Sequence, residues 1–307
     1  MCWLRQLCFN WRLIHPEKLM STIAAHHVFH ATASDWLCGD HTLARYHWPA
    51  PELPAKAHVL LVHGLGEHMG RYNHVAYALQ CAGYAVEGYD HIGHGLSSGV
   101  RGDVTTPHQL VDDLAAVVAD VQHHKPRTVP LVLLGHSMGG LVVARALAQQ
   151  SCTADAAVLS APAFAAFTNA VQKLLLATVP KFLPHLRVAN GLQLQWLARD
   201  AQVVRAYRED KLVHDRIAAG LAAWIMAEGA KAVQEAAQWR TPSLLLYAGQ
   251  DHLVNPQGCV DFAQAVLPQF LQTQCFNVMY HEIFNDPEKH LVFNKLVAWL
   301  DQQFVKA

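Results

Sequence analysis

Apolar residues in this chain of 307 residues follow two patterns that alternate along the sequence. Some stretches are apolar almost throughout, as at 57–62, and predict strands buried on both faces of a sheet. In others the apolar positions recur every three or four residues, as at 107–124, and predict helices that bury one face. Strands are expected at 26–31, 42–48, 57–62, 84–89, 129–134, 156–160, 243–248 and 273–279. Helices are expected at 72–82, 107–124, 138–150, 257–267 and 288–304.

The alternation of strands and helices predicts an α/β fold with a mainly parallel, eight-stranded sheet and helices on both faces. The first two strands alternate apolar and polar residues instead, which indicates an antiparallel hairpin at a sheet edge. From 162 to 238 the alternation of strands and helices stops, and helical patterns punctuated by proline and glycine follow. We call residues 162–238 the cap segment, because such an insertion is expected to form a helical cap over the strand ends. Residues 20–161 and 239–307 then form the α/β core.

Residues 1–19 admit two interpretations. Trp3, Leu7 and Trp11 recur at helical spacing, with two arginines among the polar positions, as in an amphipathic helix that lies at a membrane surface. Alternatively, Met20 is the natural start and residues 1–19 are an extension, which is the interpretation we favour. No apolar stretch approaches the roughly 20 residues that a membrane-spanning helix requires.

Composition narrows the range of functions. Apolar residues make up 52% of the chain, enough for a large core, and the net charge of −1 argues against nucleic-acid binding. The seven cysteines include no Cys-x-x-Cys pair, which predicts reduced thiols and a cytoplasmic protein. Histidine is frequent, with 21 residues, but His91 and His94 lack a third partner for zinc and no His-Glu-x-x-His occurs. We therefore expect no metal and no cofactor.

The hexapeptide Gly-His-Ser-Met-Gly-Gly at 135–140 lies between a predicted strand and a predicted helix. This is the context of a nucleophile elbow, a tight turn that presents a serine and needs glycines where side chains would clash. Ser137 is then the candidate nucleophile. The alternative is a glycine–serine turn that merely caps a helix, and the buried strand before the motif argues against it.

A serine nucleophile requires a histidine base and an acid that orients the histidine. In this architecture the acid and then the histidine follow the serine in the sequence, in loops after late strands. Asp251 and His281 each follow a predicted strand in that order. We therefore expect Ser137, Asp251 and His281 to form the catalytic triad. When Asp251 is considered alone, the alternative interpretation is a turn-forming aspartate. When His281 is considered alone, the alternative is a histidine in a surface loop. Weaker competitors for the two roles are His252, Asp261, Asp286 and His290.

The oxyanion formed during ester hydrolysis needs two backbone N–H donors. Met138, directly after the nucleophile, is expected to supply one. The second should come from the loop after an earlier strand, where His63-Gly64-Leu65-Gly66 occurs, and Leu65 is the expected donor. A plain glycine turn is compatible with this role, because such a turn is what presents the amide.

Four motifs carry a resemblance to known proteins: HGLGEHMGRY at 63–72, DHIGHGLSSG at 90–99, GHSMGG at 135–140 and YHEIFN at 280–285. They resemble the signatures of monoacylglycerol lipases and related lysophospholipase-like α/β-hydrolases of the serine aminopeptidase S33 type. Residues 203–214 are similar to a cap motif of this family, and the resemblance extends over 24–304. It implies the α/β-hydrolase fold with the same triad and the same oxyanion donors.

The resemblance also implies contacts with the substrate. His68 and Arg71 would lie near the polar leaving group, and Tyr207 of the cap segment would face it. Each of these residues also has an alternative role within the protein itself. For Arg71 the alternative is an ion pair with Glu67, and for His68 and Tyr207 it is ordinary packing. Three residues depart from the family pattern, namely Trp36 for a hairpin glycine, Val278 for a glycine before the histidine, and Lys211 for a cap proline. The last two leave the substrate preference open.

The expected activity is hydrolysis of monoacylglycerols or similar single-chain lipid esters, with an apolar acyl tunnel supplied by the cap segment. The alternatives are a lysophospholipase, a small-ester carboxylesterase, a peptidase and a non-catalytic binding protein. The presence of every triad member argues against the last of these. Peripheral contact of the cap segment with a membrane is a further expectation, against the alternative that its apolar residues are core.

Overall fold

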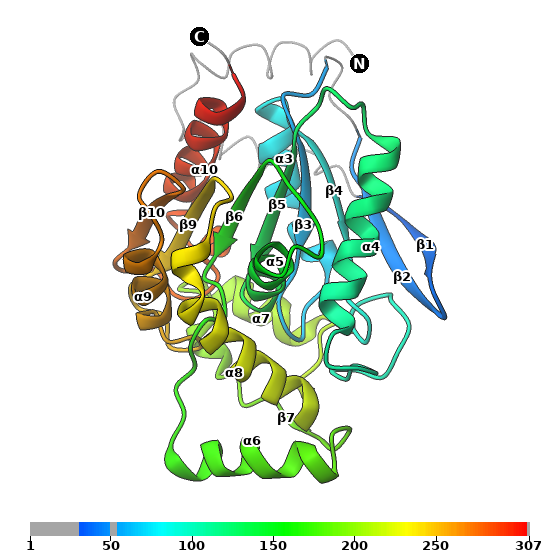
Figure 1. The fold of residues 1–307 in the computed structure, drawn as a ribbon, viewed down its shortest axis with the longest axis vertical. Helices are drawn as coiled ribbons and strands as arrows, with labels where there is room; N and C mark the ends of the chain where they lie inside the picture. Colours follow the sequence, from blue (N-terminus) through cyan, green and yellow to red (C-terminus); the bar gives the residue numbers. More distant parts are fainter. Residues whose placement is uncertain (1–30, 50–53, 306–307) are drawn as a thin grey trace.

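The computed structural model describes residues 31–49 and 54–305. Eight strands of this part of the chain form one sheet in the order β1-β2-β4-β3-β5-β6-β9-β10 (Figure 1). Neighbouring strands from β4 to β10 are parallel, whereas β2 lies antiparallel to both β1 and β4. The strands are β1 (Thr32–Cys38), β2 (His41–His47), β3 (His58–Val62), β4 (Ala85–Tyr89), β5 (Leu131–His136), β6 (Ala156–Ser160), β9 (Ser243–Ala248) and β10 (Leu271–Phe276). The predicted fold class is confirmed.

The hairpin at the sheet edge differs from the prediction in its first strand. All but residue 31 of the expected strand 26–31 lies outside the described residues, and the partner of β2 is Thr32–Cys38. Gly39, with a φ of 62°, and Asp40 form a two-residue turn that pairs Cys38 with His41. A turn this short fixes the register of the hairpin, and the apolar alternation alone does not reveal it.

Helices cover both faces of the sheet (Figure 1). Those on one face are α4 (Gln109–His124), α5 (Met138–Ala148) and α9 (Gln257–Ala265), and those on the other are α3 (Asn73–Cys81) and α10 (Lys289–Phe304). Successive residues of the central strands enter opposite cores, so that Leu60 faces the first set of helices and Leu61 the second. Burial on both faces is the reason that these strands are apolar throughout.

The cap segment joins β6 to β9. It forms α6 (Ala170–Phe182), α7 (Ala201–Glu209) and α8 (Ala219–Gln234), and α6 packs on α8 (Figure 1). It also contains a two-stranded sheet of β7 (Arg187–Ala189) and β8 (Arg216–Ala218). The sequence pattern showed no strand here, because three residues are too few for a recognisable alternation. No helix within the described residues is both long and apolar enough to cross a membrane.

Candidate active site

Ser137 lies in a sharp turn between β5 and α5. Its φ of 54° and ψ of −119° are unusual for a residue that carries a side chain. Backbone hydrogen bonds hold this conformation. The N–H of Ser137 donates to the carbonyl of Ser160 at 2.9 Å, and the carbonyl of Ser137 accepts from Leu141 at 3.1 Å and from Ala163 at 3.0 Å. The strained conformation points to a functional role for this serine.

The glycines of the elbow motif are required by close backbone approach. A Cβ atom on Gly135 would lie 2.4 Å from the carbonyl oxygen of Gly139. A Cβ atom on Gly139 would lie 2.3 Å from the carbonyl oxygen of Val62 in the neighbouring strand β3. These distances are far below a normal van der Waals contact, so that only glycine lets α5 start this close to the sheet.

His281 and Asp251 are brought together from the loops that follow β10 and β9. Nδ1 of His281 donates to Oδ2 of Asp251 at 2.6 Å. The other oxygen, Oδ1, accepts from the backbone N–H groups of Leu253 and Val254, both at 2.9 Å. Because the aspartate holds the proton on Nδ1, Nε2 of a neutral His281 is left as an acceptor. This is the tautomer that a general base needs.

The two charges of this pair support each other. Burial would lower the pKa of His281, but the carboxylate of Asp251 outweighs it and holds that pKa above its ordinary value. Burial would likewise raise the pKa of Asp251, but His281 holds it below its ordinary value. His136 packs against the ring of His281 with centroids 4.8 Å apart, and burial lowers the pKa of His136 to about 4. His136 is therefore neutral near pH 7 and adds no charge beside the base.

Ser137 and His281 open on one cavity of about 610 Å³, and Leu65 and Met138 line the same cavity. Met138 is the first residue of α5, so that its N–H has no acceptor within the helix. The loop that carries Leu65 lies against the serine, because a Cβ atom on Gly64 would be 3.1 Å from the Cβ atom of Ser137. Both predicted oxyanion donors are thus beside the predicted nucleophile.

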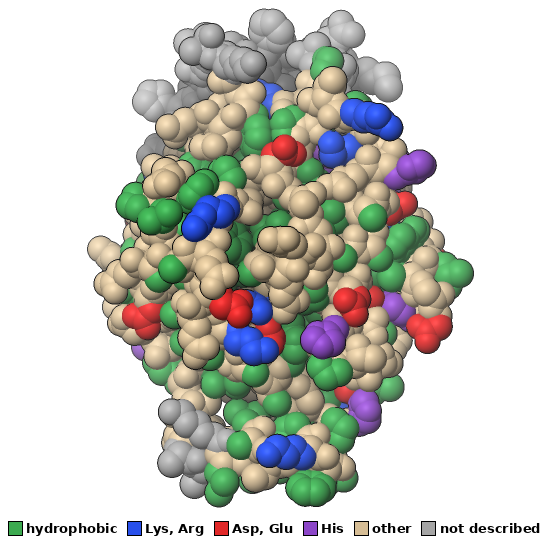
Figure 2. Space-filling model, in the orientation of Figure 1, with side chains coloured by type: hydrophobic (Ala, Val, Ile, Leu, Met, Phe, Trp, Pro, Cys, Tyr) green, Lys and Arg blue, Asp and Glu red, His purple; other side chains and the backbone are tan. Residues whose placement is uncertain are grey.

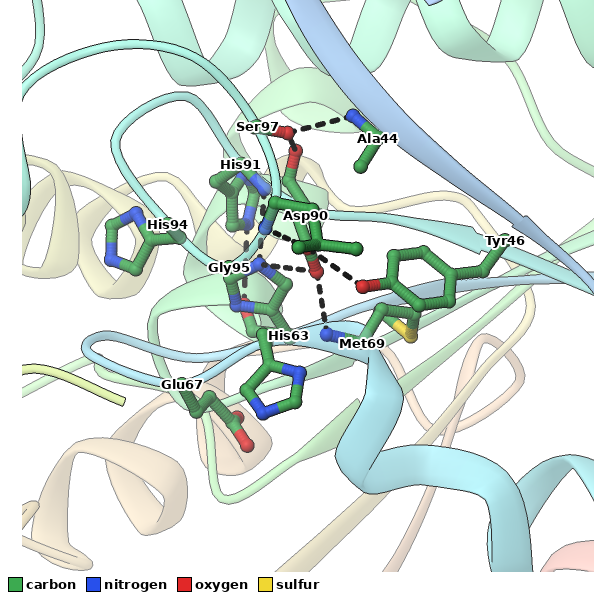
Figure 3. A network of polar contacts seen from close by, with 12 residues as sticks. Ala44, Tyr46, His63, Glu67, Met69, Asp90, His91, His94, Gly95 and Ser97 are labelled. Atoms are coloured by element: carbon green, nitrogen blue, oxygen red, sulfur yellow. Dashed lines mark hydrogen bonds and ion pairs between the residues drawn. The ribbon is translucent and has the colours of Figure 1, made fainter. Parts of the chain in front are cut away.

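The loops at 63–72 and 90–99 are held in place by a buried carboxylate, Asp90 (Figure 3). Asp90 accepts hydrogen bonds from the backbone N–H of Met69 at 2.6 Å, from that of Leu96 at 2.7 Å and from the hydroxyl of Tyr46 at 3.0 Å. These bonds join two loops and a strand that are distant in the sequence. Asp90 therefore fixes the positions of the loops at 63–72 and 90–99 relative to β2.

Buried histidines tie the same two loops together (Figure 3). Nδ1 of His63 donates to the carbonyl of Gly64 at 2.7 Å, and its Nε2 accepts from the backbone N–H of His91 at 3.0 Å. Rings of His91 and His94 donate to the carbonyls of His63 and Ile92. Burial lowers the pKa of His63, of His91 and of His94. These neutral rings serve as hydrogen-bonding parts of the scaffold.

Arg71 belongs to a buried cluster of charges beside the cavity. Its guanidinium donates to Glu67 at 2.6 Å and to both carboxylate oxygens of Glu282 at 2.6 and 2.8 Å. Glu67 in turn accepts from the backbone N–H of Gly64 at 2.7 Å, so that the cluster supports the loop that carries Leu65. Burial would raise the pKa of Glu67, but Arg71 holds it below its ordinary value. Arg71 does not line the cavity, and its geometry fits the ion-pair alternative.

His68 and Tyr207 connect the core to the cap segment. Nε2 of His68 lies 2.8 Å from Oδ2 of Asp210, directly after α7, and His68 does not line the cavity. Tyr207 of α7 is buried and does line it. Its ring lies under the guanidinium of Arg71, 4.6 Å from centroid to Cζ, at a distance typical of a cation–π contact. Of the three expected substrate contacts, Tyr207 alone reaches the cavity.

Comparison with known protein families assigns the chain to one of them. The family described as Hydrolase_4, serine aminopeptidase S33, matches residues 54–288. This chain belongs to that family. The resemblance seen in the sequence motifs is therefore confirmed, and the chain is a hydrolase of the S33 family.

Relatives of this S33 hydrolase cover most of its length. A monoacylglycerol lipase from Mycolicibacterium smegmatis is 34% identical over 254 residues, which cover 81% of this chain and 90% of the relative. The crystal structure of a monoacylglycerol lipase from Paleococcus ferrophilus is 33% identical, has a TM-score of 0.77 and covers 85% of this chain and 99% of that one. A monoglyceride lipase from Saccharomyces cerevisiae, 21% identical with a TM-score of 0.84 over 92% of this chain and 99% of that one, shares the fold.

Several residues of the S33 site were missed by sequence reasoning. Glu282 and Asp210 were not expected to pair with Arg71 and His68, from which they are 211 and 142 residues distant in the sequence. Asp90 was quoted within a motif but given no role. A buried carboxylate at the start of a glycine-rich motif is a usable signal, because burial of such a charge requires several donors.

Proposed function

We propose that this protein is a serine esterase that hydrolyses monoacylglycerols, or similar single-chain lipid esters, to a fatty acid and an alcohol. The observation that carries the proposal is one cavity onto which Ser137 and His281 open, with Asp251 hydrogen-bonded behind His281. Monoacylglycerol lipases that are similar over more than four-fifths of the chain support the substrate class.

In the proposed reaction, Oγ of Ser137 attacks the ester carbonyl carbon while Nε2 of His281 takes the serine proton. The N–H groups of Leu65 and Met138 stabilise the oxyanion. The bond to the alcohol oxygen then breaks as His281 returns the proton to that oxygen, which leaves an acyl-serine. Water gives a proton to His281 and attacks the acyl carbonyl. The bond from the acyl carbon to Oγ of Ser137 then breaks as His281 returns the proton to Oγ, which releases the fatty acid and restores the free serine. Asp251 stabilises the imidazolium in both halves, and no step needs a metal or a cofactor.

The volume and the apolar lining of the cavity are suited to a single acyl chain. Its volume of about 610 Å³ lies within the range of roughly 300–1,000 Å³ that holds one small ligand. The cap segment supplies much of the apolar lining, which includes Phe164, Phe167, Leu176, Leu192, Ile225 and Met226. We assign the acyl chain to this lining and propose that residues 162–238 act as a cap over the core formed by 20–161 and 239–307.

We assign the leaving alcohol to the end of the cavity at Tyr207. Its hydroxyl and the side-chain amide of Asn190 are polar groups of the cap segment near Gly66. Arg71 and His68 hold the surrounding structure without lining the cavity. This modifies the expectation that all three residues contact substrate. Arg71 and His68 are proposed as positioning residues.

We also propose that α6 contacts a membrane surface at the cytoplasmic side. Figure 2 shows apolar side chains gathered over α6 at the lower end of the molecule. They include Leu174, which is 64% exposed, and Phe182, which is 81% exposed. Exposed apolar patches of this kind mark interaction surfaces. The cysteines at 38, 152, 259 and 275 are free thiols, in keeping with a reducing compartment. Weaker sedimentation of Leu174→Ser/Phe182→Ser with anionic vesicles supports the contact, and binding equal to that of Leu37→Ser, a control on β1, removes it.

The function is tested by hydrolysis of a panel of monoacylglycerols, lysophospholipids and short p-nitrophenyl esters. Wild type should prefer monoacylglycerols, and Ser137→Ala should lose turnover of every ester. Ser151→Ala, in an exposed turn after α5, is the matched control and should retain it. Equal turnover by wild type and Ser137→Ala removes the mechanism. Cleavage of short esters alone, or of lysophospholipids above all others, keeps the triad but replaces the substrate.

A further inference from the structure

Three side chains of metal-binding type meet where the β1–β2 hairpin lies against α4. Cys38 ends β1 and His41 begins β2, while Asp113 lies on the second turn of α4. Their sulfur, ring nitrogen and carboxylate oxygen all lie within 4.8 Å of one another. Nε2 of His41 is 3.0 Å from Oδ1 of Asp113, and Sγ of Cys38 is 3.8 Å from the same oxygen. Ligands held about 2.0–2.3 Å from a tetrahedral zinc ion are separated by about 3.3–3.8 Å, close to these distances.

The hydrogen bonds around this cluster leave a gap that a cation would fill. Nδ1 of His41 lies 3.3 Å from a carboxylate oxygen of Asp40, which can only accept, so that the ring proton belongs on Nδ1. The lone pair on Nε2 then faces Oδ1 of Asp113, which is also an acceptor. Oδ2 of Asp113 is buried without a hydrogen-bond partner. With the ring proton on Nδ1, the contact of 3.0 Å between Nε2 and Oδ1 joins two acceptors, which a positive ion bound to both groups would satisfy.

We propose that Cys38, His41 and Asp113 bind a zinc ion, with water as the fourth ligand. The mixed set of sulfur, nitrogen and oxygen ligands is one that zinc accepts. A thiolate and a carboxylate together balance the 2+ charge, which makes the buried site neutral. This assignment is independent of the ester hydrolase function and departs from the expectation that the chain holds no metal.

Neighbouring groups orient two of the ligands. The carboxylate of Asp40 accepts a hydrogen bond from Nδ1–H of His41. A carboxylate in this position fixes the tautomer of a zinc-bound histidine. Gln109, the first residue of α4, donates from its side chain to Oδ1 of Asp113 at 2.8 Å. The His41 side chain is 13% exposed, which gives the ion a path from solvent.

Zinc must displace a proton from the thiol. Binding transfers this proton to water and forms the zinc–sulfur bond. The bound ion then links the hairpin to α4 and stabilises the sheet edge against local opening.

The test uses the full chain after chelator treatment, titrated with zinc chloride and, separately, with cobalt chloride. We expect one equivalent of each ion to bind, and cobalt to give a thiolate-to-cobalt charge-transfer band. Cys38→Ser should lose that band, whereas Cys275→Ser, a partly buried thiol on the opposite edge strand β10, should keep it. Absence of the band in wild type, or zinc affinity equal in wild type and Cys38→Ser, overturns the proposal.

A second variant guards against loss of folding in Cys38→Ser. The side chain of Asp40 is fully exposed, so that Asp40→Asn should fold normally. Loss of such an orienting carboxylate should weaken zinc binding by roughly ten- to hundredfold. Asp35→Asn, on the exposed face of β1, is the control and should bind as wild type does. Equal affinity in Asp40→Asn, Asp35→Asn and wild type contradicts the assigned site.

Discussion

The loops around Ser137 and the outer helix of the cap segment are built on different principles. Around the serine, buried charges such as Asp90 and Glu67 accept several hydrogen bonds each and hold backbone positions that tolerate no Cβ atom. In α6 the side chains are mostly exposed, and the helix packs chiefly on α8. Many hydrogen bonds thus fix the backbone around Ser137, whereas the proposed acyl site is lined by apolar side chains that can be exchanged. Mutations in the two regions should therefore act on different kinetic parameters.

The largest effect should come from Asp251→Asn. The amide would no longer hold the proton on Nδ1 of His281, so that the base is presented in the wrong tautomer, and kcat should fall by about 10⁴-fold. Asp261→Asn, an exposed position on α9, is the matched control. Steady-state kinetics on a monoacylglycerol measure both. A loss below tenfold for Asp251→Asn would show that another acid orients the histidine.

Gly139→Ala should give the next largest effect. Its Cβ atom would overlap the carbonyl oxygens of Val62 and His63 at 2.3 and 2.4 Å, so that α5 must move away from the sheet. Overpacking of this kind costs about 1–3 kcal/mol in the free energy of unfolding, and a displacement of the elbow near 1 Å lowers kcat by about 100-fold. Gly39→Ala meets no atom within 4 Å and bears only the strain of a positive φ. Its kcat should equal that of wild type, and an unchanged kcat in Gly139→Ala would refute the requirement for close approach.

Leu176→Trp should alter selectivity more than catalysis. Leu176 lines the cavity from α6, and an indole there should shorten the space for the acyl chain. We expect kcat/KM for long-chain monoacylglycerols to fall by about tenfold or more, with turnover of acetyl esters retained. Ala177→Trp, at an exposed position of the same helix outside the cavity lining, supplies the comparison. Equal losses for long and short esters would mean that Leu176 supports the scaffold.

The smallest effect concerns pH. Hydrolysis needs neutral His281, so that kcat/KM should rise with pH as this residue loses its proton. Because Asp251 holds the pKa of His281 above the ordinary value of 6.5, the midpoint of this rise should lie above pH 6.5 and activity should be lost as pH falls through it. A pH–rate profile on a soluble ester measures the midpoint. A midpoint below 6.5 would indicate that burial outweighs the aspartate.

The parts of the fold that local patterns determine were predicted well. The strand at 156–160 and the start of α5 at Met138 agree with the sequence expectation, because buried runs and the elbow motif are local signals. The strand expected at 273–279 is instead Leu271–Phe276, at the edge of the sheet, where half-exposed positions give a weak pattern. Its register comes from pairing with β9, which no short window of sequence contains.

The candidate site likewise has a part that local sequence signals predict and a part that depends on long-range contacts. The positions of Ser137, Asp251 and His281 follow from chain order and strand ends, and these side chains are placed beside one cavity or bonded to one another. The partners of Arg71 and His68 depend on how the cap segment and distant loops fold back onto the core. Such long-range pairs have no local signature in the sequence. The structure is therefore needed to show that Arg71 and His68 do not line the cavity.

Active-site labelling is the most direct test that Ser137 is the nucleophile. A lipid-like fluorophosphonate reacts only with an activated serine, and digestion followed by mass spectrometry locates the phosphonyl group. We predict one adduct per chain, on Ser137, formed rapidly in wild type, slowly in Asp251→Asn and not at all in Ser137→Ala. An adduct on another residue, or labelling of Ser137→Ala at the rate of wild type, would contradict it.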